Sequence, residues 1–288
     1  MLFVVTSLPS EARTLRNACA ARRRGMTLIE LAVVIAILAI LAGLIMPRLA
    51  FIRTMSTHAT GATALQEITQ NMLTFHSTQA RWPHRFDSLL TGSGGTSSPS
   101  GIYGSGGGAQ GLDSTINAGL LQMTTLTSSQ KTSLSGLLGN PNGNTTILEV
   151  MDHDETITKP GNSGINARDL NTSGNNLSVA TINSAHNVNP TDLNSASGSI
   201  IYNTVFPQGN PNNEIIVALG VGPNCTAVTK TIVTPPVMYL KDSTRYNRVI
   251  VLIRVRPDGV QASLAGAITP DGRTLDQCLG NFRVTAER

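Results

Sequence analysis

The chain has 288 residues, of which 13% are charged and 4% are aromatic. Five of its 21 basic residues and one of its 17 acidic residues lie in residues 1–25, so the rest of the chain carries no net charge. Nothing in that balance indicates a nucleic-acid partner, which would need a basic patch on the folded domain. The abundance of Gly, Ser, Thr and Asn favours a β-rich exported protein over a compact cytosolic enzyme.

The first predicted element is a long apolar helix. Residues 21–49 read ARRRGMTLIELAVVIAILAILAGLIMPRL, and residues 31–46 contain no charge. Residues 26–46 would extend about 30 Å as an α-helix, long enough to span a bilayer. A cleaved secretory signal would end at a small-x-small site, whereas Pro47 and Arg48 end this stretch without one. The arginines just before it predict that its first end stays in the cytoplasm.

One carboxylate, Glu30, lies near the start of this apolar helix. An unpaired carboxylate in hydrocarbon costs about 3 kcal/mol, and the neighbouring helix positions are apolar. A cut between Gly25 and Met26 would create an α-ammonium one helical turn from Glu30, in a first turn whose dipole favours an anion. The alternative is an uncut signal anchor with Glu30 at headgroup level, and physical chemistry weighs the two about evenly.

The sequence RRRG, followed by MTLIEL and an unbroken apolar helix, resembles the processing segment of type IV prepilins and type II secretion pseudopilins. The resemblance covers about residues 20–75. It implies cleavage after Gly25 by a prepilin peptidase, N-methylation of Met26, and pairing of Glu30 with a neighbouring subunit's N-terminus. It also implies a helix kink at Pro47. Met26 as the first mature residue and a leader of residues 1–25 are similar to the type IVb branch, although the apolar start MLFVVTSLP is unusual for a leader.

The resemblance also implies partners and a location. The partners are identical or related pilin subunits, the prepilin peptidase, the inner-membrane assembly platform and inner-membrane lipid. The implied location is the bacterial inner membrane, as a single-pass protein with its head in the periplasm, and then an extracellular pilus. No cofactor is implied.

Beyond the membrane segment, the helix is expected to continue to about residue 76. Leu65, Ile68, Met72 and Phe75 recur at spacings of three and four, which makes one apolar stripe. We expect the stripe to pack against a globular head, and the alternative is packing against neighbouring helices. We therefore assign residues 1–25 to a leader and 26–76 to the helix, with 26–46 as its transmembrane half.

The head divides by composition into two regions. Residues 77–213 are loop-rich: a glycine-rich flexible loop is expected at 91–111, one or two short helices at 112–139, and short strands with turns thereafter. Residues 214–288 contain strand-like segments at 214–222, 248–256 and 260–268, and the turn sequence RPDG at 256–259 predicts a hairpin between the last two. The predicted fold class is α+β, with a long N-terminal α-helix packed on a head that contains an antiparallel β-sheet.

Three cysteines are present, Cys19, Cys225 and Cys278. Removal of the leader leaves two, and an even pair in an oxidising compartment favours a disulfide over two unpaired buried thiols. In the pilins that the chain resembles, such a bond closes a C-terminal loop on the subunit's outer face.

The sequence contains no recognisable catalytic motif, and none of its five histidines has a cysteine or a second histidine at metal-ligand spacing. The acidic cluster at residues 152–155 (DHDE) could help bind calcium, but a solvated loop is favoured. We therefore expect no enzyme, no metal site and no cofactor. The expected function is a major or minor structural subunit of a type IV pilus. The alternatives are a type II secretion pseudopilin and a signal-anchored periplasmic binding protein or enzyme.

Overall fold

The computed structural model describes most of the helices and strands and part of the loops. The described residues are 27–91, 101–102, 119–138, 149–151, 167–169, 178–186, 198–210, 212–223, 225–234, 238, 246, 248–258 and 262–286. The chain divides into two compact units, Met1–Phe51 and Ile52–Arg288. Helix α1 (Leu28–Gln79) begins in the first unit and ends in the second, close to the predicted end at residue 76.

In the first unit, α1 exposes apolar side chains on every side. All described side chains between residues 28 and 49 are exposed. The large apolar ones among them are Leu28, Ile29, Leu31, Val33, Val34, Ile35, Ile37, Leu38, Ile40, Leu41, Ile45, Met46 and Leu49. Over the described residues, no helix is both long and apolar enough to cross a membrane.

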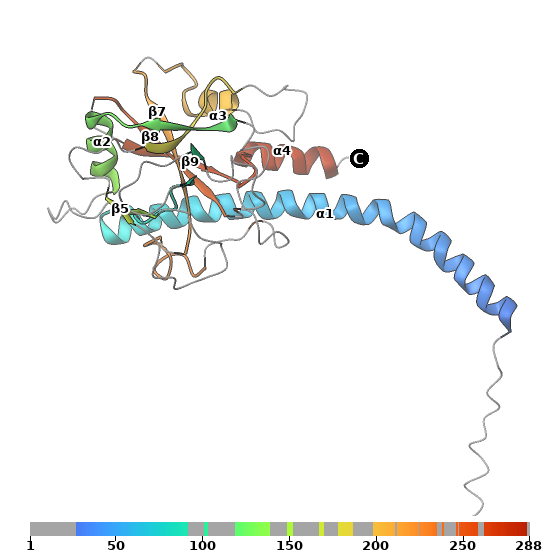
Figure 1. Cartoon of the computed structure of the whole chain (residues 1–288). Coiled ribbons are helices and arrows are strands. Elements are labelled where there is room, and N and C mark those ends of the chain that lie inside the picture. The colour runs from blue at the N-terminus through green and yellow to red at the C-terminus, as the bar shows by residue number, and fades with distance from the viewer. Residues whose placement is uncertain are drawn as a thin grey trace, which may run out of the picture. The chain divides into compact units, whose positions relative to one another are not determined.

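The head is built on a five-stranded antiparallel sheet, which confirms the α+β prediction (Figure 1). Its strands, in spatial order, are β3 (Leu121–Thr125), β6 (Ser178–Ile182), β7 (Ile215–Gly220), β8 (Ile250–Val255) and β9 (Ala262–Ile268). The last three coincide with the three strand-like segments, and β8 and β9 form the predicted hairpin. The register of this hairpin shifts near Gly266, whose φ of 147° is a conformation that favours glycine.

Smaller elements complete the head. Strand β1 (Leu90–Thr91) pairs with β2 (Gly101–Ile102), and β4 (Glu149–Met151) pairs with β5 (Ala167–Asp169). The helices are α2 (Ser128–Leu138), α3 (Gly198–Val205) and α4 (Leu275–Ala286). Helix α2 falls where short helices were expected, at 112–139. The same prediction is wrong for residues 121–125, which form β3 and pair with β6, because a short apolar segment does not distinguish a helix from a strand. Helix α4 was missed, because residues 214–288 were assigned to the sheet region alone, and most of the predicted glycine-rich loop lies outside the described residues.

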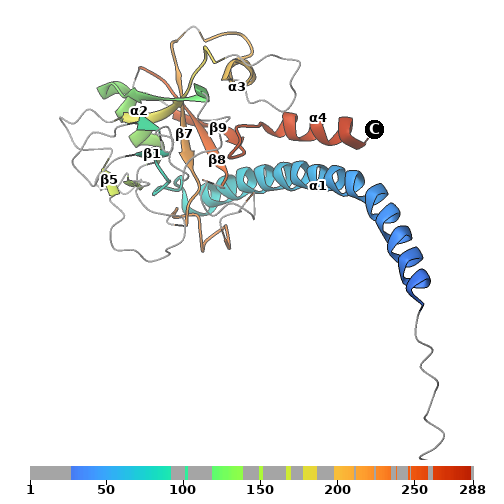
Figure 2. The ribbon, with the colours of Figure 1, turned by 45° about the vertical axis from the view of Figure 1, so that its right-hand side comes forward.

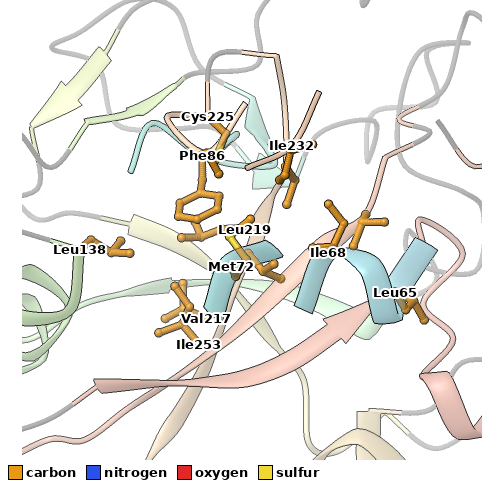
Figure 3. Packing of buried hydrophobic residues seen from close by; sticks show 14 of the residues in the cluster. Leu65, Ile68, Met72, Phe86, Leu138, Val217, Leu219, Cys225, Ile232 and Ile253 are labelled. Carbon is orange, nitrogen blue, oxygen red and sulfur yellow. The ribbon is translucent and has the colours of Figure 1, made fainter. Parts of the chain in front are cut away.

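The second part of α1 packs on one face of the sheet, as the apolar stripe predicts. Leu65, Ile68, Met72 and Phe75 are all at most 2% exposed. They share a core cluster with Val217 and Leu219 of β7 and with Val251, Ile253 and Val255 of β8 (Figure 3). These strand residues alternate in sequence because side chains two apart point to the same face of a sheet.

The opposite face of the same strands is buried as well. Ile216 and Ala218 of β7, with Ile250 and Leu252 of β8, form a second cluster with Ile201 of α3. Burial on both faces explains why β7 and β8 read as continuous apolar segments rather than as alternating ones. The central strands are thus held between α1 on one face and α3 on the other.

Candidate functional site

The start of α1 is the candidate functional site, and Glu30 has a local partner there. The side-chain oxygen of Thr27 accepts a hydrogen bond from the Glu30 N–H at 3.3 Å. In return, Glu30 Oε2 accepts from the Thr27 N–H at 2.9 Å and from the Thr27 hydroxyl at 3.1 Å. This reciprocal arrangement is a capping box, which satisfies backbone donors that a helix N-terminus leaves unpaired.

Thr27 is the functional residue that the sequence reasoning missed. Its carbonyl accepts the first helical hydrogen bond, from Leu31 N at 3.1 Å, so Thr27 is the N-cap of α1. The expectation that Glu30 has no partner on its own helix is therefore wrong. The signal was present in the sequence as T-x-x-E directly before an apolar helix.

The cap engages only part of the Glu30 carboxylate. Oε2 receives both bonds from Thr27, and among the described residues Oε1 accepts no hydrogen bond. The carboxylate also lies in the first turn of α1, where the helix dipole favours a negative charge.

The other predicted processing residues are only partly visible. Gly25 and Met26, the predicted cleavage and methylation positions, lie outside the described residues. The backbone at Pro47 is helical within α1, and the kink there stays a prediction. The acidic cluster at residues 152–155 also lies outside, and the described part of the chain holds no group of side chains able to bind a metal ion.

The two cysteines of the head do not form the predicted disulfide in this structure. Cys225 and Cys278 are free and buried, 2% and 1% exposed. Cys225 follows β7 among the side chains around Phe86, whereas Cys278 lies on α4 against Gly61 of α1. Burial raises the pKa of Cys225 to about 12 and that of Cys278 to about 11, which favours the protonated thiol at both positions. The count of cysteines predicted a pair but carried no information on their separation.

Buried polar groups in the head are paired in ways that stabilise the fold. Glu214, directly before β7, accepts hydrogen bonds from Arg254 of β8 and from Arg256 directly after β8, and these guanidinium contacts lower the pKa of its carboxyl group. The hydroxyl of Tyr246 donates to Asp87 at 3.1 Å, and burial raises the pKa of this tyrosine.

Comparison with known proteins gives one match, at the N-terminus. Residues 20–46 match the prokaryotic N-terminal methylation motif. The matched residues include the predicted cleavage point, the Thr27–Glu30 cap and the whole charge-free stretch at 31–46. The match supports a signal segment of the type IV pilin-like or pseudopilin kind, without separating the two. No curated protein and no solved structure matches the chain.

Proposed function

We propose that the protein is a structural subunit of a type IV pilus, of the IVb-like branch, that assembles after cleavage between Gly25 and Met26 and methylation of Met26. The methylation motif at residues 20–46 supports the processing step. Two features favour the IVb-like branch: the length of the leader, residues 1–25, and the methionine at the first mature position, Met26. A minor subunit fits the 288-residue precursor as well as a major one does.

The observation that carries the proposal is the state of Glu30. Cleavage after Gly25 keeps the amide of Thr27, so the capping box survives processing. The new α-ammonium would then stand one residue before the cap. On this proposal, Oε1 of Glu30 would accept from such an ammonium on a neighbouring subunit, and a desolvated pair of this kind would contribute more to register than to net stability.

The apolar surface of the first unit is compatible with contact to lipid first and to other subunits later. The sequence of residues 26–46 has the length and apolarity of a bilayer span. The exposed apolar side chains of α1 would contact inner-membrane lipid before assembly and other subunits afterwards. An exposed apolar surface of this extent in water would favour aggregation.

The test separates the charge of Glu30 from its capping role. In Glu30→Gln, glutamine keeps the capping box but removes the charge. In Thr27→Ala, the cap is lost and the charge stays. We expect Glu30→Gln to be cleaved and methylated, as read by intact mass, yet absent from sheared surface filaments. Thr27→Ala should still assemble, with a helix terminus weaker by about 1 kcal/mol.

The opposite pattern would refute the proposed role. If Glu30→Gln assembles at the wild-type level, the charge does not pair with an incoming N-terminus and Glu30 serves only the helix cap. If the wild-type chain keeps residues 1–25 in cells that contain the prepilin peptidase, the protein is an uncut anchored binding protein or enzyme. A processed chain that is found only in short, envelope-bound assemblies would identify the pseudopilin alternative.

A further inference from the structure

A buried histidine of α1 contacts the turn that precedes the C-terminal helix. His58 is 4% exposed. Its Nδ1 lies 2.9 Å from a terminal nitrogen of Arg273, in the turn between β9 and α4. Nε of the same arginine lies 3.0 Å from Asp271 Oδ2. The three side chains form a chain of contacts from α1 to the turn.

This contact fixes the protonation state of His58. A guanidinium has only N–H donors and keeps its proton at all relevant pH values. The nitrogen that faces it must therefore offer a lone pair, so His58 is neutral and carries its proton on Nε2. A proton added at Nδ1 would set two N–H groups against each other and place two positive charges in contact. Burial, with the charge of Arg273 as a second cause, lowers the pKa of His58, and Asp271 opposes that shift.

The turn that carries Arg273 is itself closed by internal bonds. Thr269 N donates to the Arg273 carbonyl at 2.9 Å, and Arg273 N donates to the Thr269 hydroxyl at 2.9 Å. The Thr269 hydroxyl also donates to Asp271. Thr274 then caps α4, with Gln277 N donating to its hydroxyl and Gln277 Oε1 accepting from its N–H. A displacement of Arg273 is therefore passed directly to the start of α4.

Helix α4 lies beside α1 in both orientations of the ribbon (Figure 1 and Figure 2). The two helices meet at Gly61, one turn after His58. A Cβ atom on Gly61 would lie 3.4 Å from the Cys278 sulfur, an ordinary van der Waals distance, so the thiol of α4 lies against the backbone of α1 at this point. The titratable groups that the described elements direct at this part of α1 are thus Arg273, Asp271 and Cys278. Only His58 among these four ordinarily titrates between pH 5 and pH 7.

We infer that His58, Arg273 and Asp271 form a proton-operated latch that holds α4 on α1 at neutral pH and releases it in acid. The sign follows from linkage: a histidine kept neutral by the closed contact binds its proton more readily when the contact is open. Closure is fully favoured above the usual histidine pKa of about 6.5 and is lost as pH falls below it. One proton lowers the ratio of closed to open forms by at most about tenfold per pH unit.

The test is hydrogen exchange of the full chain in detergent micelles, measured by mass spectrometry from pH 7.5 to pH 5 and corrected for the intrinsic exchange rate. Peptides from α4 report the latch, and peptides from β7 and β8 report the sheet. The informative variant is His58→Gln, whose amide oxygen accepts from Arg273 at every pH. The matched control is His76→Gln. His76 is an exposed histidine on the same helix, and its ring centroid lies 4.5 Å from that of Trp82.

In the wild type and in His76→Gln, opening of α4 should rise by up to about tenfold per pH unit below pH 6.5, while the sheet stays protected. In His58→Gln, opening of α4 should not change with pH. The inference is wrong if acid leaves α4 protected in the wild type, or if His58→Gln loses protection in the same way. Should His58→Gln fail to fold, nitrogen-15 chemical shifts of the wild-type imidazole decide instead. A charged His58, or one that carries its proton on Nδ1 at pH 7, would overturn the latch.

Discussion

Met72 and Leu73 are neighbours on α1 that the structure places in opposite environments. Met72 is 1% exposed and lies in the core cluster beside Val217 and Leu219, whereas Leu73 is 52% exposed (Figure 3). Truncation of each to alanine removes a side chain of similar size from the same helix. Comparing the stability of the two alanine variants therefore tests whether the apolar stripe of α1 is part of the core of the head.

The expected effects differ severalfold. Met72→Ala removes buried apolar surface and leaves a cavity, which costs about 2–5 kcal/mol of the free energy of unfolding. Leu73→Ala changes an exposed position and should stay within about 0.5 kcal/mol. For a head of this size, about 2–4 °C of Tm corresponds to 1 kcal/mol, so Met72→Ala should lower Tm by roughly 4–20 °C and Leu73→Ala by at most about 2 °C.

The assay is thermal unfolding of the full chain in detergent micelles, followed by tryptophan fluorescence. Trp82 is the only tryptophan of the sequence and packs, half-buried, against the same cluster, so its emission reports the head and not the apolar half of α1. Equal shifts for the two variants would refute the assignment. The stripe would then be stabilised mainly by neighbouring subunits, which is the alternative that the sequence left open.

Further predictions concern the rest of the head. Iodoacetamide at pH 8 should leave Cys225 and Cys278 unmodified in the folded protein, because burial raises the pKa of both thiols. Denaturation without a reductant should expose both thiols to alkylation. If the mass of the denatured protein does not increase, the two cysteines form a disulfide. Gly222→Ala should lower the free energy of unfolding by about 1–3 kcal/mol, because the new Cβ atom would overlap the buried carboxylate of Asp87. Gly136→Ala should raise it by about 0.5–1 kcal/mol, because a Cβ atom there meets nothing within 4 Å and alanine favours the α2 helix; chemical denaturation measures both changes. Glu214→Gln should cost about 1–2 kcal/mol at pH 7, since two partly exposed arginines lose a charged acceptor. The pKa of Glu214 is lowered in the folded state, so this contribution is present above about pH 4.5 and is lost as pH falls through the folded value, where variant and wild type should converge.

The sequence predicted the elements whose signals are local and periodic. The stripe from Leu65 to Phe75 recurs with the helical period, and the strand-like segments at 214–222, 248–256 and 260–268 contain β7, β8 and β9. This helix, these three strands and their hairpin were therefore predicted correctly, whereas β3 lies in a range that was expected to be helical. Helix α4 was missed because it is short and largely polar. Its capping sequence, Thr274 to Gln277, was nevertheless visible.

Features that depend on distances across the fold could not be predicted. Two cysteines in the last third of the chain indicate a pair only if their α-carbons come close, and chain order does not specify this. The cap between Thr27 and Glu30, by contrast, is local, and its T-x-x-E signal was present in the sequence. The contact of His58 with Arg273 joins residues that are 215 positions apart in the sequence, so no short-range sequence pattern predicts it.

The core on the α1 face of the sheet is assembled from the two extremes of the chain. Met72 comes from the first third of the sequence, and its partners Val217 and Ile253 come from the last third. Contacts between such distant segments form late, because the intervening chain must be closed into a loop first. During synthesis, the stripe of α1 therefore emerges long before β7 and β8 can cover it. Until the last strands arrive, the stripe is exposed apolar surface that favours premature association with other chains.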